Sequence, residues 1–140
     1  MRMDTCEKRP ICEIGYAADD RGRGVVYARV RRRGGERVLR LAFRIERCPG
    51  LGDREVGYAA LSAIAPLIRK QVAEIVFEVG DADLVDDLTR RRDLPVPLML
   101  PYIRARCALN AFESYALKSG ADANDLAARA LAEVTIRIAA

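Results

Sequence analysis

The sequence predicts an α/β fold built around a mixed β-sheet, and three patterns lead to this prediction. Residues 25–33 and 38–47 alternate between apolar and polar side chains on either side of a Gly-Gly pair, as the strands of an antiparallel hairpin do. Apolar residues then recur at helical spacing between positions 53 and 70. The stretch 74–79, rich in apolar and β-branched residues, follows that helix, which indicates a strand added by a crossover connection.

The N-terminal half is expected to form a three-stranded antiparallel meander. A polar lead over residues 1–10 precedes the first strand at 11–18, and a polar turn with two glycines leaves that strand. The next two strands each have one apolar and one charged set of alternating residues, so we expect the meander to bury one face. That face holds Val26, Ala28, Val30, Leu39, Leu41, Phe43 and Ile45.

The C-terminal half is expected to alternate helices with strands. Asp53 is a suitable N-cap for the helix that ends near residue 70, and Pro66 should kink this helix because its ring removes one backbone hydrogen bond. After the 74–79 strand we expect a short helix at 84–91, a proline-rich break at 95–101 and a helix at 102–110. A strand at 112–117 and a helix at 123–134 should follow. Residues 135–140 would form a frayed tail or an added edge strand.

Composition limits the classes of function. A chain of 140 residues, 51% hydrophobic and 31% charged, is expected to form a single domain over residues 1–140, and no apolar run approaches the roughly 18 residues of a membrane span. The charged first ten residues are unlike a signal peptide, so we expect a cytoplasmic protein with no membrane partner. Its four cysteines form no CxxC pair and are expected to be reduced.

The absence of histidine narrows the chemistry further. Without histidine the chain lacks the usual partner of a zinc site and every Ser-His or Cys-His catalytic arrangement. Any catalysis would therefore use carboxylates, and with them a divalent metal that takes oxygen ligands.

Polar side chains stand at the start of two helices and at the end of one strand. Glu55 lies in the first turn of the main helix, one position off its apolar stripe, and would sit at the rim of the surface on which the helix packs. Asp81 follows the 74–79 strand, and Asn124 stands at the start of the last helix. Each residue also has a purely local interpretation, because such side chains cap helix N-termini and complement the helix dipole.

The order of these elements, together with short motifs, resembles type 1 ribonuclease H over nearly the whole chain. Residues 54–60 are similar to the opening of the family's first helix, with Glu55 in the glutamate position. Residues 81–85 are similar to the aspartate-serine-x-x-valine motif after the family's fourth strand, with Asp81 in the metal-binding position. The resemblance implies a five-stranded mixed sheet in the order 3-2-1-4-5, flanked by helices, with four acidic residues around two magnesium ions.

The resemblance also has departures, which concern the remaining two acidic positions. Residues 123–127 are similar to the family's closing alanine-aspartate-x-leucine-alanine motif, but Asn124 replaces the aspartate. In the first strand a direct alignment puts Ala17 in place of the central aspartate. A shift by two residues keeps each side chain on the same face of the sheet and puts Asp19 there instead. The histidine of the family's catalytic loop has no counterpart. The implied ligands of Mg²⁺ or Mn²⁺ are therefore Asp19, Glu55 and Asp81, with Asn124 as a weaker fourth catalytic position.

Two groups of arginines suggest contact with a nucleic acid. The second strand places three arginines on one face, with Arg40 and Arg44 expected beside them, and a run of three follows near residue 91. Arginine on an exposed hairpin also protects against aggregation, so a structural interpretation is equally available. The few aromatic residues argue against a base-stacking surface for single strands. The candidate nucleic-acid contacts are Arg29, Arg31, Arg33, Arg90, Arg91 and Arg92.

Two functional hypotheses follow from the sequence. The first is a ribonuclease H-like protein that binds nucleic acid and acts as a weakened metal-dependent nuclease on the RNA strand of an RNA/DNA hybrid. The second is a catalytically inactive module that kept the fold for nucleic-acid or protein interaction. The first strand and Asn124 distinguish them, because each lost carboxylate weakens a two-metal site. The sequence leaves the substrate and the oligomeric state open.

Overall fold

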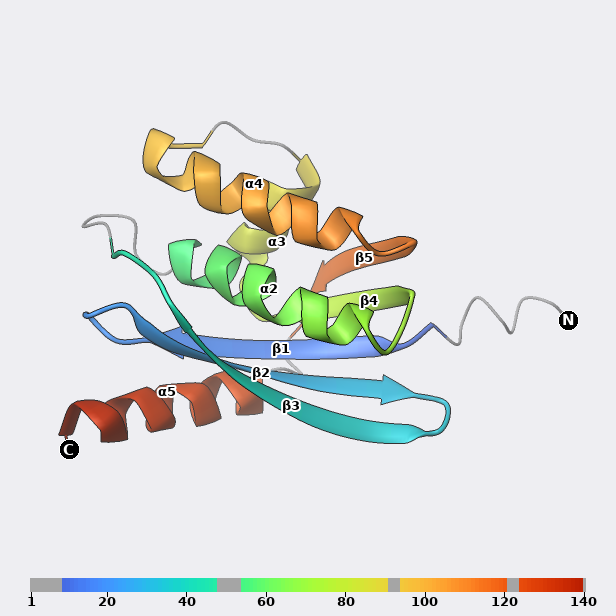
Figure 1. The fold of residues 1–140 in the computed structure, drawn as a ribbon, viewed down its shortest axis with the longest axis horizontal. Coiled ribbons are helices and arrows are strands. Elements are labelled where there is room, and N and C mark those ends of the chain that lie inside the picture. Colours follow the sequence, from blue (N-terminus) through green and yellow to red (C-terminus); the bar gives the residue numbers. More distant parts are fainter. Residues whose placement is uncertain (1–8, 48–53, 91–93, 121–123, 140) are drawn as a thin grey trace, which may run out of the picture.

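Five strands form one mixed sheet with helices on both of its faces (Figure 1). The computed structural model describes residues 9–47, 54–90, 94–120 and 124–139. The strands are β1 (Ile11–Ala18), β2 (Arg23–Arg32), β3 (Gly35–Arg44), β4 (Glu74–Val79) and β5 (Ser114–Ser119). The helices are α2 (Arg54–Arg69), α3 (Ala82–Arg90), α4 (Val96–Asn110) and α5 (Asn124–Ala139). The sheet order is β3-β2-β1-β4-β5, so the predicted class and strand order are confirmed.

The register of β1 determines where the candidate site residues lie. β1 pairs with β2 in antiparallel fashion and with β4 in parallel fashion, and β4 also pairs in parallel with β5. Val79, the last residue of β4, lies opposite Ile14. β1 continues from Ile14 to Ala18, so its C-terminal end extends past the end of β4.

One face of the sheet packs against α2 and, at β5, against α3, while α4 packs mainly on α2, and this layer holds the main core. Val26, Ala28 and Val30 are buried there as predicted, and Leu39, Leu41 and Phe43 of β3 pack against them. The helices contribute Tyr58, Leu61 and Ile64 from α2 and Leu84 and Leu88 from α3, all at 1% exposure or less. Burial of each such side chain stabilises the fold by about 1.5–3 kcal/mol.

The opposite face is covered by α5, so the expectation that the meander buries only one face is wrong. Val25 and Tyr27 of β2 form a second cluster with Leu126, Ala130 and Val134 of α5. The helix can lie this close because β1 presents Gly15, where an added Cβ would lie 2.2 Å from the Ala127 nitrogen. The last residues are helical as far as Ala139 and form neither a frayed tail nor an edge strand.

The proline-rich break expected at 95–101 is also wrong, because α4 begins at Val96. Pro95 is the N-cap residue and Pro97 lies in the first turn, where helical N–H groups have no partner within the helix. Only Pro101 lies inside the helix. Helix α2 also contains a proline, Pro66, which is exposed to solvent, and the helix continues on both sides of it. The predicted N-cap of α2, Asp53, lies outside the described residues. Strand bounds differ from those expected by two or three residues, as at β3 and β5.

None of the described helices combines the length and the apolar character that crossing a bilayer would take.

Candidate functional site

The end of β4 and the start of α5 lie close together. A Cβ added to Gly80 would lie 3.2 Å from Asn124 Oδ1, so Asn124 approaches the residue directly before Asp81. Asp81 itself is the N-terminal cap of α3. Its Oδ1 atom accepts hydrogen bonds from the backbone N–H groups of Asp83 at 3.0 Å and Leu84 at 3.3 Å. One oxygen of the Asp81 carboxylate is therefore already used to hold the helix.

The first strand offers one carboxylate, Asp19, which is engaged in its own turn, and one alanine, Ala17. Asp19 lies five residues past Ile14, about 16 Å along the strand from the last β1–β4 pair. Its carboxylate organises the β1–β2 turn, where Oδ1 accepts the N–H groups of Arg21 and Arg23 at 2.9 Å and Oδ2 pairs with the Arg23 guanidinium at 2.8 Å. Burial raises the pKa of Asp19, but these hydrogen bonds and the charge of Arg23 outweigh it and hold the pKa below its ordinary value. Ala17 packs against the α5 cluster.

Glu55 and Gly57 lie on different sides of α2. Gly57 is the point where α2 approaches β1 and α3, since an added Cβ would lie 2.7 Å from the Tyr16 hydroxyl oxygen and 2.8 Å from Leu84 Cδ2. Two residues along a helix correspond to a rotation of about 200°, so Glu55 does not share the direction of the Gly57 contact. There it lies 3.7 Å from Arg47, which follows β3, with a side-chain exposure of only 6%.

These directions do not fit a pair of divalent metal ions. Such a pair needs several carboxylates from adjacent elements converging on a span of roughly 4 Å. Among the described residues no three acidic or cysteine side chains are grouped so that they could hold a metal ion. Asp81 with Asn124 supplies one carboxylate and one amide oxygen at the end of β4, while Asp19 and Glu55 face other partners. The four catalytic positions implied by the resemblance therefore remain a prediction.

Two of the predicted nucleic-acid contacts are ion-paired on the sheet. Arg29, with 15% side-chain exposure, pairs with Glu13 at 2.7 Å and with Asp125 at the start of α5. These bonds raise the pKa of Arg29, and the same Arg29 contact lowers the pKa of Asp125. Arg31 pairs with Glu13 at 3.2 Å and with Glu36 at 3.3 Å. Their charges are therefore largely neutralised within the fold.

The other predicted contacts differ among themselves. Arg33 is exposed at the β2–β3 turn and has no ion pair with any described residue. Arg90 ends α3, and nothing is described of its side chain. Arg91 and Arg92 lie outside the described residues.

Three buried acidic residues were not predicted: Glu13, Asp87 and Glu78, the last of which lies on β4 and pairs with Lys118 at 3.2 Å. Glu13 is 1% exposed on β1, with Oε2 lacking a hydrogen-bond partner, and links Arg29 to Arg31. Asp87 of α3 is fully buried, where it accepts hydrogen bonds from the Tyr58 hydroxyl at 2.7 Å and from Arg54. Burial and the bond to Asp87 raise the pKa of Tyr58. The sequence signal that could have indicated a buried acidic residue is a charged residue between apolar neighbours, as Glu13 is between Cys12 and Ile14.

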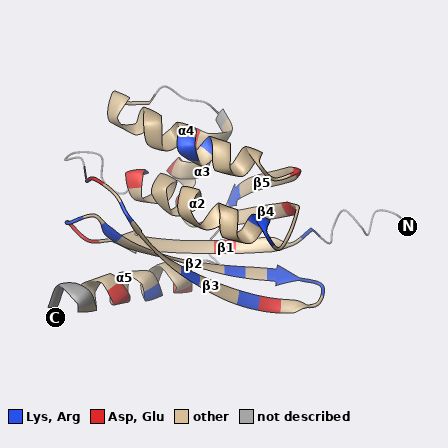
Figure 2. Ribbon diagram, viewed as in Figure 1, with Lys and Arg blue, Asp and Glu red and all other residues tan. Residues whose placement is uncertain are grey.

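One group of cations without carboxylate partners among the described residues lies at the tip of the β2–β3 hairpin and the C-terminal end of α2 (Figure 2). Arg32 at the end of β2 donates a hydrogen bond to the Gln71 carbonyl just after α2, which brings the hairpin tip against the end of that helix. A shallow pocket of about 200 Å³ lies there, with Arg32 and Arg37 in its walls. Within the described chain none of these cations forms an ion pair. We call this group the basic end: Arg32, Arg33, Arg37, Arg69 and Lys70, all exposed.

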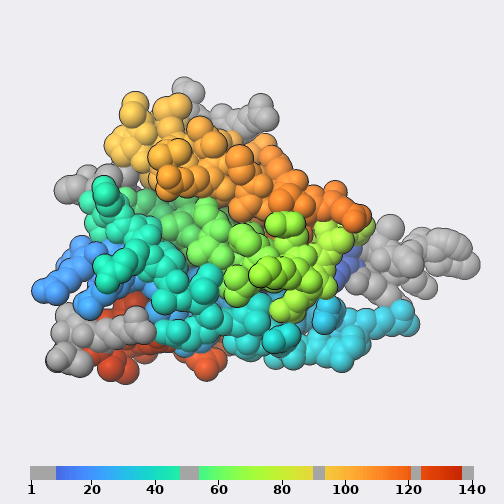
Figure 3. All heavy atoms as spheres, in the orientation of Figure 1, coloured from blue at the N-terminus to red at the C-terminus, as the bar shows by residue number. Residues whose placement is uncertain are grey.

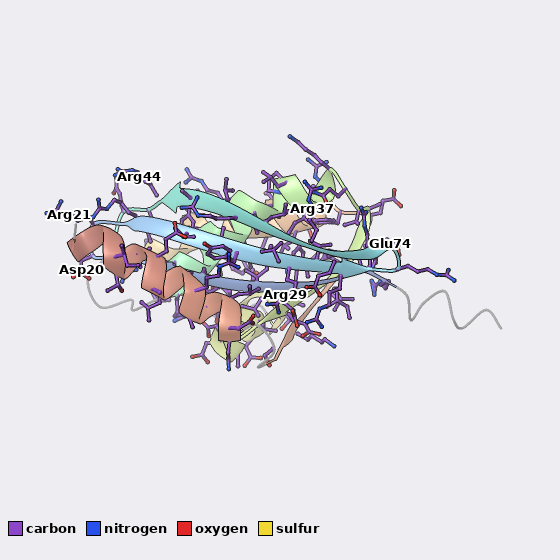
Figure 4. The ribbon with its side chains drawn as sticks, turned by 90° about the horizontal axis from the view of Figure 1, so that it is seen from below. Asp20, Arg21, Arg29, Arg37, Arg44 and Glu74 are labelled. Carbon is purple, nitrogen blue, oxygen red and sulfur yellow. The ribbon has the colours of Figure 1, made fainter. Side chains whose placement is uncertain are left out.

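Figure 4 shows the sheet from the side of α5, with Arg37 toward one end and Arg21 and Arg44 at the other. Arg21 and Arg44 lie beside the β1–β2 turn, where Asp19 is held. The candidate acidic positions and the basic end are therefore separated along the length of the sheet.

Comparison with known proteins identifies the fold. No protein-family model matches the sequence, and no curated protein is significantly similar to it. Among solved structures, the chain is similar to ribonuclease H1 of the halophilic archaeon Halobacterium salinarum NRC-1, with a TM-score of 0.70 and 20% identity over 92% of this chain and 98% of that one.

Two further structures agree. The N-terminal ribonuclease H domain of a Mycobacterium tuberculosis protein, solved as a fusion with maltose-binding protein, has a TM-score of 0.70 and 16% identity over 94% of this chain and 99% of that one. LC11 ribonuclease H1, in complex with an RNA/DNA hybrid, has a TM-score of 0.61 and 12% identity over 91% of this chain and 99% of that one. The predicted resemblance is thus confirmed at the level of the fold.

Proposed function

We propose that this chain, which has the ribonuclease H fold, binds the phosphate backbone of a nucleic-acid duplex through its basic end and does not hydrolyse it. The observation that carries the proposal is the contrast in pairing. Five exposed cations at the basic end have no ion pair with a described residue, whereas the candidate metal ligands Asp19, Glu55 and Asp81 each hold a partner within the fold. Arginine is well suited to phosphate, which it can contact through two N–H groups at once.

The position of the basic end supports binding without cleavage. Glu55 stands at one end of α2 and Arg69 at the other, about 21 Å apart by helical rise. A backbone held at Arg37 and Arg69 therefore lies far from Asp81 and Asn124 at the end of β4. The hybrid-bound ribonuclease H1 among the similar structures makes an RNA/DNA hybrid the first probe to use.

The test is the salt dependence of binding to a labelled 20-base-pair RNA/DNA hybrid, measured by fluorescence anisotropy between roughly 25 and 200 mM KCl. Affinity should fall steeply as salt rises, because each phosphate contact releases about 0.9 counterion. The double change Arg32→Ala with Arg37→Ala should lower the slope of log K against log salt by roughly 1–2 and weaken binding about uniformly across sequences.

The matched control is Arg21→Ala with Arg44→Ala, which removes two arginines from the other end of the sheet (Figure 4). This variant should keep the wild-type slope. Equal loss in both variants would mean that binding follows total charge and not the basic end, and no binding at low salt would favour a module for protein interaction.

A metal-dependent nuclease is the second candidate, and the adjacency of Asp81 and Asn124 is the observation that favours it. Cleavage of the labelled hybrid in manganese separates the two functions. Under our proposal wild type does not cleave. Three results together would support the nuclease hypothesis: wild type cleaves the hybrid, Asn124→Asp raises the rate, and Glu55→Gln abolishes it. In that case the proposal of a purely binding module fails.

A further inference from the structure

Helix α4 is apolar on two sides, and only one of them is covered. Leu98, Ala105 and Leu109 are buried against the core, and the Tyr102 ring meets Tyr58 of α2 edge-on at 6.0 Å. The other side exposes four large apolar side chains, more than half of the seven exposed in the described chain. We call them the α4 stripe: Val96 (79% exposed), Met99 (49%), Leu100 (55%) and Ile103 (50%). Figure 3 shows α4 along the outer edge of the molecule.

The spacing of the α4 stripe makes it one continuous surface. Its members stand at positions i, i+3, i+4 and i+7, which lie on one side of a helix. Together they expose on the order of 400 Å² of apolar surface, a patch of the size that on monomeric proteins often marks an interaction site.

We propose that the α4 stripe is the interface of a symmetric dimer, in which α4 of one chain packs antiparallel against α4 of a second copy. A two-fold axis between Met99 and Leu100 places Met99 of each chain opposite Leu100 of the other. The same axis places Val96 opposite Ile103. All four members of the stripe thus find an apolar partner in a second copy, as an isologous interface requires.

The charges on α4 permit this pairing. The helix has no acidic residue, and its exposed cation, Arg104, forms no ion pair with a described residue. The two-fold axis sets Arg104 of one chain opposite position 95 of the other. The two Arg104 side chains are then offset by nine residues, about 13 Å along the helix. This exceeds the Debye length of about 10 Å at 0.1 M salt, so their repulsion is largely screened.

The area of the stripe also suits a dimer. A stable interface buries about 800 Å² on each partner, of which roughly 57–65% is apolar. The roughly 400 Å² of the α4 stripe approaches that apolar share, and Pro95, Pro97 and Cys107, which are also exposed on α4, lie where a rim would form. The proposal does not depend on nucleic-acid binding, which uses a different part of the molecule.

Sedimentation equilibrium of the full chain between about 5 and 200 µM tests the proposal, at 0.15 M salt and in reducing buffer. Wild type should form a dimer in this range. Leu100→Glu should weaken association by roughly 100-fold, because the symmetric interface loses two leucines and buries two charges. The matched control is Leu131→Glu on α5, where the leucine is 57% exposed. That variant should dimerise like wild type, and circular dichroism should show the same fold for all three proteins.

A charge-rescue variant tests the axis itself. Met99→Lys combined with Leu100→Glu places opposite charges across the two-fold axis, so association should return in part at low salt and disappear near 0.5 M salt. A wild-type monomer at 200 µM overturns the proposal, as does a dimer that survives Leu100→Glu. Dimerisation without rescue overturns the antiparallel register.

Discussion

The arginines of the β2–β3 hairpin fall into two groups that the sequence alone does not separate. Arg29 and Arg40 lie on the face that α5 covers, and α5 supplies Asp125 to the first and Glu133 to the second. Arg32 and Arg37 lie on the other face, beyond the end of α2, and have no carboxylate partner among the described residues. Both groups stand in strands that carry several arginines. For Arg29 and Arg40 the last helix supplies a carboxylate partner, whereas Arg32 and Arg37 on the other face remain available to a ligand.

The first prediction concerns stability and has the largest expected effect. Arg29→Ala should lower the free energy of unfolding by about 2–3 kcal/mol, because it removes the closest cation from Glu13, which is 1% exposed, while Arg31 remains at 3.2 Å. Urea denaturation of wild type and variant measures this loss.

The matched variant is Arg37→Ala from the unpaired group. Its stability should stay within about 0.5 kcal/mol of wild type, as is usual for exposed side chains away from special contacts. If the two variants lose equal stability, the division of the hairpin arginines into structural and available groups is wrong.

Much of the fold followed from the sequence because its patterns are local. The alternation of Val26, Ala28 and Val30 and the helical spacing of apolar residues between positions 53 and 70 each reflect the geometry of one element, and the strand order followed from the resemblance. The second covered face was missed because it depends on Gly15, whose missing side chain lets α5 approach β1. The start of α4 was missed because Pro95 and Pro97 were read as breakers, although prolines suit the first turn of a helix.

The candidate site was less predictable, because it depends on side-chain direction. Asp81 and Asn124 stand where the strand order places them, at the end of β4. The direction of Glu55, however, depends on which residue of α2 faces β1, and the structure gives that position to Gly57. The partners of Asp19 and Glu13 are set by pairing across strands and turns, which residue spacing along the chain does not encode.

The second prediction concerns Arg23, another paired arginine, whose partner Asp19 lies in a turn and not in a helix. Asp19→Ala should lower stability at pH 7 by about 1–2 kcal/mol, because two backbone N–H groups and Arg23 lose their acceptor. The pKa of Asp19 is lowered in the folded state, so its carboxylate stabilises the fold above the unfolded pKa, and this contribution disappears as the pH falls through the folded pKa.

Unfolding curves at pH 7, 4, 3 and 2.5 check the sign of this effect. The difference between wild type and Asp19→Ala should be constant near neutrality and should shrink below about pH 4, near the ordinary aspartate pKa. A difference that grows on acidification would show that the carboxylate is not the stabilising group in the turn.

The smallest effect is expected at Arg40, which pairs with Glu133 on the same face as Arg29 but is 40% exposed. Arg40→Ala should lower stability by only about 0.5 kcal/mol, since exposed ion pairs contribute little and Glu133 keeps the hydrogen bond from the Tyr27 hydroxyl at 2.6 Å. The loss should halve or vanish in 0.5 M NaCl, where the attraction is screened. Arg44→Ala, on the same side of β3 and without an ion pair to a described residue, is the control and should change stability less at either salt concentration. Arg29 and Arg40 both pair with α5, but only Arg29 also pairs with a buried carboxylate, that of Glu13. A large loss of stability in Arg40→Ala would therefore mean that contact with the helix, and not pairing with a buried carboxylate, makes an arginine structural.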